Sequence, residues 1–117
     1  HGNFMADNLK ILGQSNPSAT TNTDLYTVPD KTQTTISSIT VAETSGADAT
    51  FRIAVRVGGA AISGLSQYIA YDKTVPANDT ISFVIGITLN QTDIVTVYAS
   101  SANVAFNVFG CETLEER

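Results

Sequence analysis

One stretch of the chain, TISFVIGITLNQTDIVTVYA at residues 80–99, limits the folds open to it more than any other. Apolar side chains recur at every second position of residues 81–87, which is the period of a strand with one buried face. A second strand-like run covers residues 94–99, and turn residues separate the two runs. We expect a central hairpin or a corner between two sheets, with Leu89 in the core beneath a turn that Asp93 closes.

Strand patterns recur along the rest of the chain, with turn signals rich in Gly, Pro, Asn and Asp between them. The further strands are expected at residues 6–14, 25–28, 32–43, 49–57, 68–75 and 104–110. About eight short antiparallel strands at this spacing predict an all-β protein, a two-sheet Greek-key sandwich. We favour a jelly-roll strand order over an immunoglobulin-like one.

Three of these strands have features that a structure can check. The first is expected to be anchored by Leu9, Ile11 and Leu12. In the third, the apolar pattern slips by one residue, which predicts a β-bulge at Ser37-Ser38. The core face of the fourth is expected to carry Phe51, Ile53, Val55 and Val57.

The chain of 117 residues fits a single sandwich domain over residues 9–112. Residues 1–8 are expected to form a flexible N-terminal segment, in which residues 1–4 before Met5 are interpreted as a tag remnant. Residues 113–117 are expected to form a charged C-terminal tail. Fraying of the chain is expected to begin slightly earlier, at Cys111.

Composition argues against several classes of protein. The net charge of −5 lacks the basic footprint that nucleic acid requires, and no apolar run is long enough to span a membrane. Polarity is carried by Ser and Thr, while charged residues make up only 15% of the chain. The single cysteine, Cys111, fits synthesis in a reducing cytoplasm and is expected to be a half-buried structural residue.

We find no constellation of residues that predicts catalysis, a metal site or a cofactor. The only histidine is His1, so no Ser-His or Cys-His pair can be assembled. The aspartates lie almost entirely in predicted turns, where their carboxylates bond the local backbone, and no calcium-loop spacing occurs. The chain is therefore not expected to be an enzyme.

Arg52 and Arg56 are expected to project from the same face of their strand, away from the core. One interpretation is a solvated face with weak ion pairs. The other is a subunit interface, where arginine and tyrosine are enriched, which would also include Tyr68, Tyr71 and Leu65. Leu65 belongs to an apolar, glycine-containing loop at residues 58–67, and function is expected on this loop, on the N-terminal arm and on the Arg52/Arg56 face.

An ordered set of short motifs extends over most of residues 9–112: YTVP followed by ISSI, then TFRIAVR, PANDT, GITL, VYAS and FNVFG. The set resembles small β-sandwich proteins of tailed-bacteriophage virions. The CETLEER segment at the C-terminus extends past the usual end of such proteins.

The resemblance implies a non-enzymatic virion protein, most simply a capsid decoration or cement protein that binds the major capsid protein as a homo-oligomer, with a homotrimer favoured. The same resemblance leaves open a place in the tail, baseplate or a fibre. A carbohydrate-binding module is a further alternative, because β-sandwiches often bind sugars. The implied location is the virion, on the capsid surface or the tail, after synthesis in the host cytoplasm, with no nucleic-acid or membrane partner.

Overall fold

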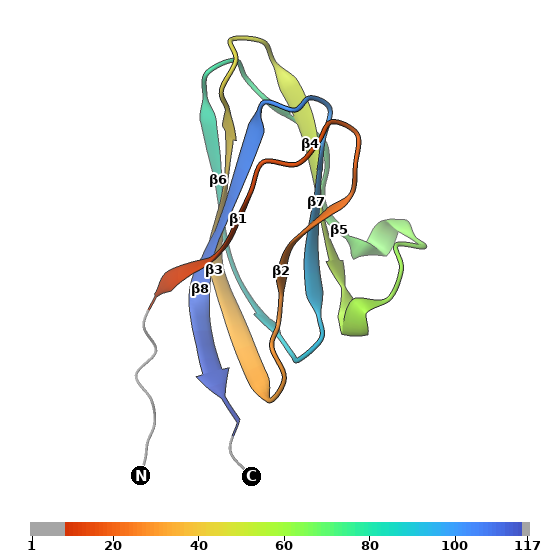
Figure 1. Ribbon diagram of the computed structural model, residues 1–117, viewed down its shortest axis with the longest axis vertical. Coiled ribbons are helices and arrows are strands. Elements are labelled where there is room, and N and C mark those ends of the chain that lie inside the picture. The colour runs from red at the N-terminus through yellow and green to blue at the C-terminus, as the bar shows by residue number, and fades with distance from the viewer. Residues whose placement is uncertain (1–8, 116–117) are drawn as a thin grey trace.

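The computed structural model describes residues 9–115, which form eight β-strands, two short 3₁₀ turns and, within this range, no α-helix (Figure 1). The strands are β1 (Lys10–Ser15), β2 (Thr23–Thr27), β3 (Thr32–Glu43), β4 (Ala49–Arg56), β5 (Tyr68–Val75), β6 (Thr80–Leu89), β7 (Ile94–Ala99) and β8 (Val104–Leu114). The 3₁₀ turns, η1 (Val57–Gly59) and η2 (Leu65–Gln67), both lie in the connection between β4 and β5.

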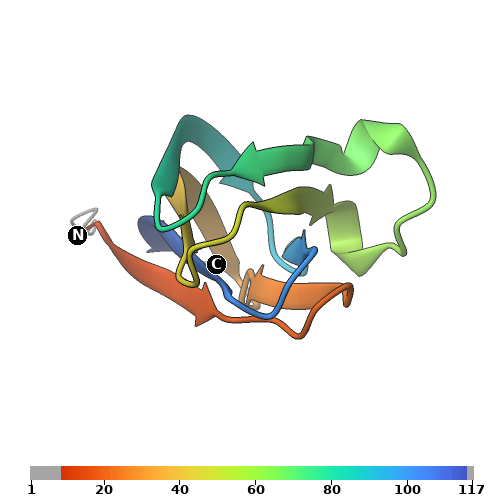
Figure 2. The ribbon, with the colours of Figure 1, turned by 90° about the horizontal axis from the view of Figure 1, so that it is seen from above.

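The strands form two antiparallel four-stranded sheets that pack face to face (Figures 1 and 2). Sheet A has the order β1-β8-β3-β6, and sheet B has the order β2-β7-β4-β5. This interleaved order is that of an eight-stranded jelly roll. The expected all-β sandwich is confirmed, and the strand order is the jelly-roll order rather than the immunoglobulin-like one.

The core consists of the inward-facing side chains of both sheets, as the two-residue alternation predicts. At its centre Phe51 of β4 packs edge-on against Phe83 of β6 and Phe106 of β8, with ring centroids 5.9 Å and 6.0 Å apart. Since Phe51 belongs to sheet B and the other two rings to sheet A, this contact joins the two layers. Phe51 and Phe106 are completely buried, and Phe83 is half-buried beside the open edge of sheet A.

The stretch at residues 80–99 is the corner between the sheets, not a hairpin within one. β6 forms the outer edge of sheet A, whereas β7 lies inside sheet B between β2 and β4. Leu89 is buried, and the carboxylate of Asp93 accepts hydrogen bonds from the backbone N–H groups of Asn90 (2.9 Å) and Gly58 (2.7 Å). The predicted roles of Leu89 and Asp93 are confirmed.

Irregular register decides which apolar residues reach the core. The bulge predicted at Ser37-Ser38 is confirmed, because the pairing of β3 with β8 and β6 shifts between Ile36 and Ser38. A second shift, between Ile11 and Gly13, turns only Leu12 of β1 toward the core. Leu9 and Ile11 remain 68% and 53% exposed, so the prediction that they anchor the first strand is wrong.

Two strand ends also differ from the prediction. β4 stops at Arg56, and Val57 enters a 3₁₀ turn where it is 72% exposed, so its assignment to the core face is wrong. β8 continues past Gly110 to Leu114, where it pairs with Thr32 at the start of β3. Thus Cys111, which is half-buried as expected, begins a paired segment and not a frayed tail. The predicted N-terminal segment at residues 1–8 lies outside the described residues.

Contacts of Glu112 help to hold the end of β8 in sheet A. Its carboxylate accepts a 2.6 Å hydrogen bond from the Tyr26 hydroxyl and pairs with Lys10 at 2.9 Å. The Tyr26 hydroxyl also lies 2.7 Å from the hydroxyl of the buried Thr34. The bond from Tyr26 lowers the pKa of Glu112, and burial together with this carboxylate raises the pKa of Tyr26.

Candidate functional site

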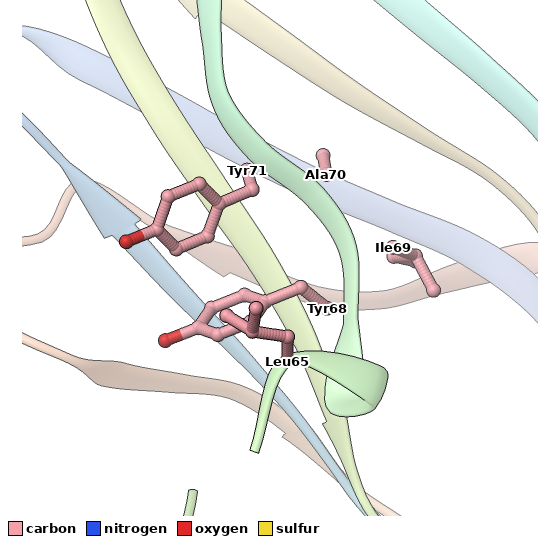
Figure 3. Close-up of a pocket in the computed structure, with 5 residues that line it drawn as sticks. All are labelled: Leu65, Tyr68, Ile69, Ala70 and Tyr71. Atoms are coloured by element: carbon pink, nitrogen blue, oxygen red, sulfur yellow. The ribbon is translucent and has the colours of Figure 1, made fainter.

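Four of the five predicted interface residues come together on the outer face of sheet B. Arg52 comes from β4, Leu65 from η2, and Tyr68 and Tyr71 from β5. Figure 3 shows the side chain of Leu65 beside the rings of Tyr68 and Tyr71. We call these four residues, together with Tyr98 of β7, the tyrosine patch.

A bulge in β5 places Tyr68 and Tyr71 on one face. Residues three apart in a regular strand point to opposite sides of the sheet. Here Phe51 pairs with Lys73 but Ile53 pairs with Ala70, so β5 contains one extra residue opposite Arg52. The two tyrosine rings consequently meet edge-on, with centroids 4.8 Å apart.

The same bulge sets the surroundings of Arg52. Its guanidinium carbon lies 4.4 Å from the ring centroids of both Tyr71 and Tyr98, and its Nε donates a 2.6 Å hydrogen bond to Asp72. Asp72, which has a φ of 49°, follows Tyr71 directly, and both residues lie opposite Arg52 across the ladder. The bond to Asp72 raises the pKa of Arg52, so the cation is permanent and held in place.

Arg56 does not join the patch, although it shares the outer face of β4. Its guanidinium pairs with Asp24 at 3.0 Å and donates to the carbonyls of Gly59 (3.0 Å) and Ala60 (2.9 Å). These contacts fasten the base of the loop at residues 58–67 to sheet B. The two arginines of the expected functional face therefore have different surroundings. Arg52 belongs to the tyrosine patch, whereas Arg56 supports the loop at residues 58–67.

The loop at residues 58–67 projects from sheet B (Figures 1 and 2) and is held by its own hydrogen bonds. The Gln67 side-chain oxygen accepts from the N–H groups of Ser63 (2.7 Å) and Gly64 (3.0 Å), and its amide donates to the Ala61 carbonyl (3.1 Å). Leu65 is 79% exposed on this ordered loop. An apolar side chain presented in a fixed position loses little conformational entropy on binding.

Two shallow cavities flank Leu65. The larger, of about 550 Å³, is lined by Leu65, Tyr68, Ile69, Ala70 and Tyr71 (Figure 3). The smaller, of about 280 Å³, lies on the loop side and includes Ile62. Most of the lining is apolar or aromatic, which suits side chains inserted by a partner.

Tyr98 and Ile69 belong to this surface but are absent from the sequence-based set. Tyr98 faces outward directly across the ladder from Arg52, a relation that depends on the register of β4 and β7. Ile69, at 41% exposure, lines the larger cavity beside a second irregularity in the pairing of β4 and β5, and Figure 3 shows its side chain on the other side of β5 from the two tyrosines. Neither the register of β4 with β7 nor the irregularity in β5 leaves a mark in the alternation of the sequence.

No group of three or more side chains able to hold a metal ion occurs within residues 9–115. In the same range, no helix is both long and apolar enough to cross a membrane. Comparison of the chain with protein-family models, with curated proteins and with solved structures gave no significant match in any of the three.

Proposed function

We propose that the protein is a non-enzymatic structural component of a tailed-bacteriophage virion, and that it decorates the capsid by binding the major capsid protein. The observation that carries this proposal is the tyrosine patch, an exposed aromatic and aliphatic surface around a fixed arginine. Residues of these types are enriched in the cores of protein interfaces and supply most of their hot spots.

The architecture supports the same proposal by analogy. Eight-stranded jelly rolls are used in viral capsid proteins, although a fold alone does not determine a function. The motifs that resemble phage virion proteins form strands and turns of this sandwich: TFRIAVR lies in β4, GITL in β6 and FNVFG in β8. They build the scaffold that carries the patch.

A decoration protein would act by mass action, since binding only to the assembled shell stabilises that shell. Leu65 and Tyr71, 79% and 52% exposed, would be buried at a junction between capsid subunits. Arg52 would keep its contacts with Tyr71 and Asp72, so its charge would be covered without losing its partner.

The test uses capsids that lack the protein and measures how they bind the purified chain. Leu65→Ser and Tyr71→Ala should each weaken binding by roughly tenfold or more, the usual effect of truncating a hot spot. The resistance of the particles to heat should fall in parallel. Leu114→Ser removes another exposed leucine, 67% exposed at the far end of β8, and should bind as the wild type does. Unchanged binding by both patch variants would rule the patch out as the contact surface.

A place in the tail, baseplate or a fibre is the alternative for the same surface. Labelling of virions with gold-conjugated antibody distinguishes these locations, because the label falls on either the head or the tail. Label on the tail alone would replace capsid decoration by a tail role.

A carbohydrate-binding role is the second candidate, and one observation favours it. Tyr71 of β5 and Tyr98 of β7 lie on either side of the Arg52 guanidinium, and Tyr68 meets Tyr71 edge-on beside a cavity. Exposed aromatic rings next to charged hydrogen-bonding groups also suit sugars, and jelly rolls occur in lectins. A glycan array without any bound sugar would remove this candidate.

The resemblance also implies oligomers with three-fold clustering. The shape of the tyrosine patch does not by itself specify a trimer. The uncharged edge of sheet A favours a different contact between copies.

A further inference from the structure

We infer that two copies of the chain associate through β6, each adding its edge strand to sheet A of the other, antiparallel and related by a two-fold axis. Edge strands direct unpaired N–H and C=O groups outward, which makes them templates for another strand. This inference goes beyond the proposed function and does not rest on it, because β6 and the tyrosine patch lie on different sheets.

The four sheet edges differ in how well they are protected. β1 and β2 are short, with six and five residues, and each has a register shift. β5 contains Asp72 and Lys73 and two register shifts. β6 has ten residues, TISFVIGITL, with neither a charge nor a proline. Charges, prolines and bulges are the usual protection against edge pairing, so β6 is the least protected edge.

The only irregularity in β6 lies toward its end. Gly86 has a φ of 59°, and the pairing with β3 shifts between Val84 and Ile87. Residues 80–84 before it pair regularly with β3. In an antiparallel pair centred on Val84, this regular segment of each copy lies opposite residues 84–88 of the other, which include Gly86.

One fully outward apolar side chain, that of Val84, lies on this edge. Val84 is 86% exposed, the highest value among the large hydrophobic residues of the described chain. Along one cross-strand row of sheet A, Val84 pairs with Ser38, Ser38 with Phe109, and Phe109 with Ile11. Ile11, Ser38 and Phe109 together line a shallow surface cavity, and Ser38 separates its apolar residues from Val84 at the free edge.

The inner face of β6 is also incompletely covered. Ile81, Phe83, Ile85 and Ile87 pack against the core but are only half-buried, because β6 has a neighbour on one side alone. If Val84 pairs with Val84 of the second copy, Phe83 pairs with Ile85 and Ile81 with Ile87. These half-buried side chains would then cover one another across the axis.

The match of half-buried side chains across the axis points to a second copy as the occupant, and the absence of charge on β6 permits it. The chain has a net charge of −5, so most contacts between two copies would bring like charges together. β6 carries no charge, and an antiparallel strand pair with itself is closed by two-fold symmetry. The resulting particle is a dimer, which differs from the trimer that the resemblance to virion proteins implies.

The experiment measures molar mass by light scattering over a dilution series for the wild type, Val84→Lys and Leu65→Lys. In the paired state of Val84→Lys the two introduced lysines would face each other, and like charges directly opposite destabilise a strand pair. We expect a wild-type dimer, at least tenfold weaker association of Val84→Lys, and an unchanged dimer for Leu65→Lys. Both positions are exposed aliphatic residues, so the two variants are matched.

A second measurement uses the unmodified chain, so it does not depend on the folding of a variant. Amide hydrogen exchange of residues 80–85 should slow as concentration rises, while exchange in residues 58–67 should not change. A monomer at every concentration, or an oligomer that Val84→Lys leaves intact, would overturn the inference. Loss of association in Leu65→Lys alone would assign the contact to the tyrosine patch. Capsid binding by the Leu65 variant is measured in a separate experiment. The absence of a β6 dimer can therefore be distinguished from the absence of capsid binding.

Discussion

Gly110 lies at a point where sheet A has no room for a side chain. A Cβ atom at this position would collide with the carbonyl oxygen of Thr35 and would lie 3.1 Å from the Cα of Ile36 and 3.0 Å from the Leu12 side chain. Two of these neighbours are backbone atoms of β3, which is held between β8 and β6 and cannot easily shift. The glycine is therefore required by close approach of strands beside the β3 bulge.

We expect Gly110→Ala to lower the free energy of unfolding by about 1–3 kcal/mol, the usual cost of overpacking a core. Urea denaturation followed by circular dichroism measures it. Gly64→Ala is the control, because a Cβ there meets no atom within 4 Å and the backbone has an ordinary φ of −155°. Equal destabilisation by the two variants would show that the close approach at Gly110 is not the cause.

At the scale of elements, Glu43 joins two turns at one end of the sandwich. Its buried carboxylate accepts a hydrogen bond from the Ser45 hydroxyl (2.6 Å) and others from the backbone N–H groups of Ser45, Gly46 and Asn78. Ser45 and Gly46 belong to the β3–β4 turn, whereas Asn78 belongs to the β5–β6 turn. These bonds, with the Ser45 hydroxyl as the largest cause, lower the pKa of Glu43 from 4.5 to about 2.

The lowered pKa predicts how acid affects stability. Above pH 4.5 the carboxylate is ionised in both states, and its contribution to folding is fully present. As pH falls from 4.5 to about 2, the unfolded chain takes up the proton first and this contribution is lost. Glu43→Gln should therefore melt below the wild type at neutral pH, with a gap that closes toward pH 2.

Melting curves over this pH range measure the effect, and Ser45→Ala provides the comparison. This variant keeps the carboxylate but removes its strongest hydrogen bond, so its melting temperature should lie between those of the wild type and Glu43→Gln. A constant gap between wild type and Glu43→Gln at all pH values would contradict the role given to ionised Glu43.

Strand positions could be predicted from the sequence where alternation runs without interruption. The predicted bounds of β3, β5 and β7 agree with the structure, because β-branched residues and turn signals mark them clearly. The ends of β4 and β8 could not be predicted. Val57 leaves the sheet because the loop turns on Gly58, and residues beyond Gly110 stay in it because Glu112 reaches Tyr26. The end of β8 depends on residues far apart in the sequence, and so does the turn at Gly58, whose N–H donates to the carboxylate of Asp93.

The tyrosine patch also depends on strand register, which the sequence pattern does not reveal. Arg52, Leu65, Tyr68 and Tyr71 could be grouped from their residue types and neighbourhood in the chain. Their geometry could not be predicted, since regular alternation would place Tyr68 and Tyr71 on opposite faces. The bulge at Asp72 reverses this, and only the register identifies Tyr98 as a member.

At the scale of the whole molecule, the sheets are built from strands distant in the sequence. β1 pairs with β8, and β8 pairs in turn with β3. Loop closure for such pairs must precede the contacts that stabilise them, which makes folding slow. We expect refolding on the order of milliseconds to seconds. Stopped-flow dilution from urea measures it, and folding within microseconds would contradict the dependence on remote pairs.

The arrangement of the tyrosines has a consequence for spectroscopy. The chain has four tyrosines and no tryptophan, so tyrosine dominates its intrinsic fluorescence. Tyr68, Tyr71 and Tyr98 all lie in the tyrosine patch, whereas Tyr26 is buried and its hydroxyl donates a hydrogen bond to the carboxylate of Glu112, so we expect its emission to be quenched. We therefore expect the emitted light to come mainly from the tyrosine patch. Any partner that covers this surface should change the intrinsic tyrosine fluorescence. Binding at the proposed contact surface can therefore be followed without a label.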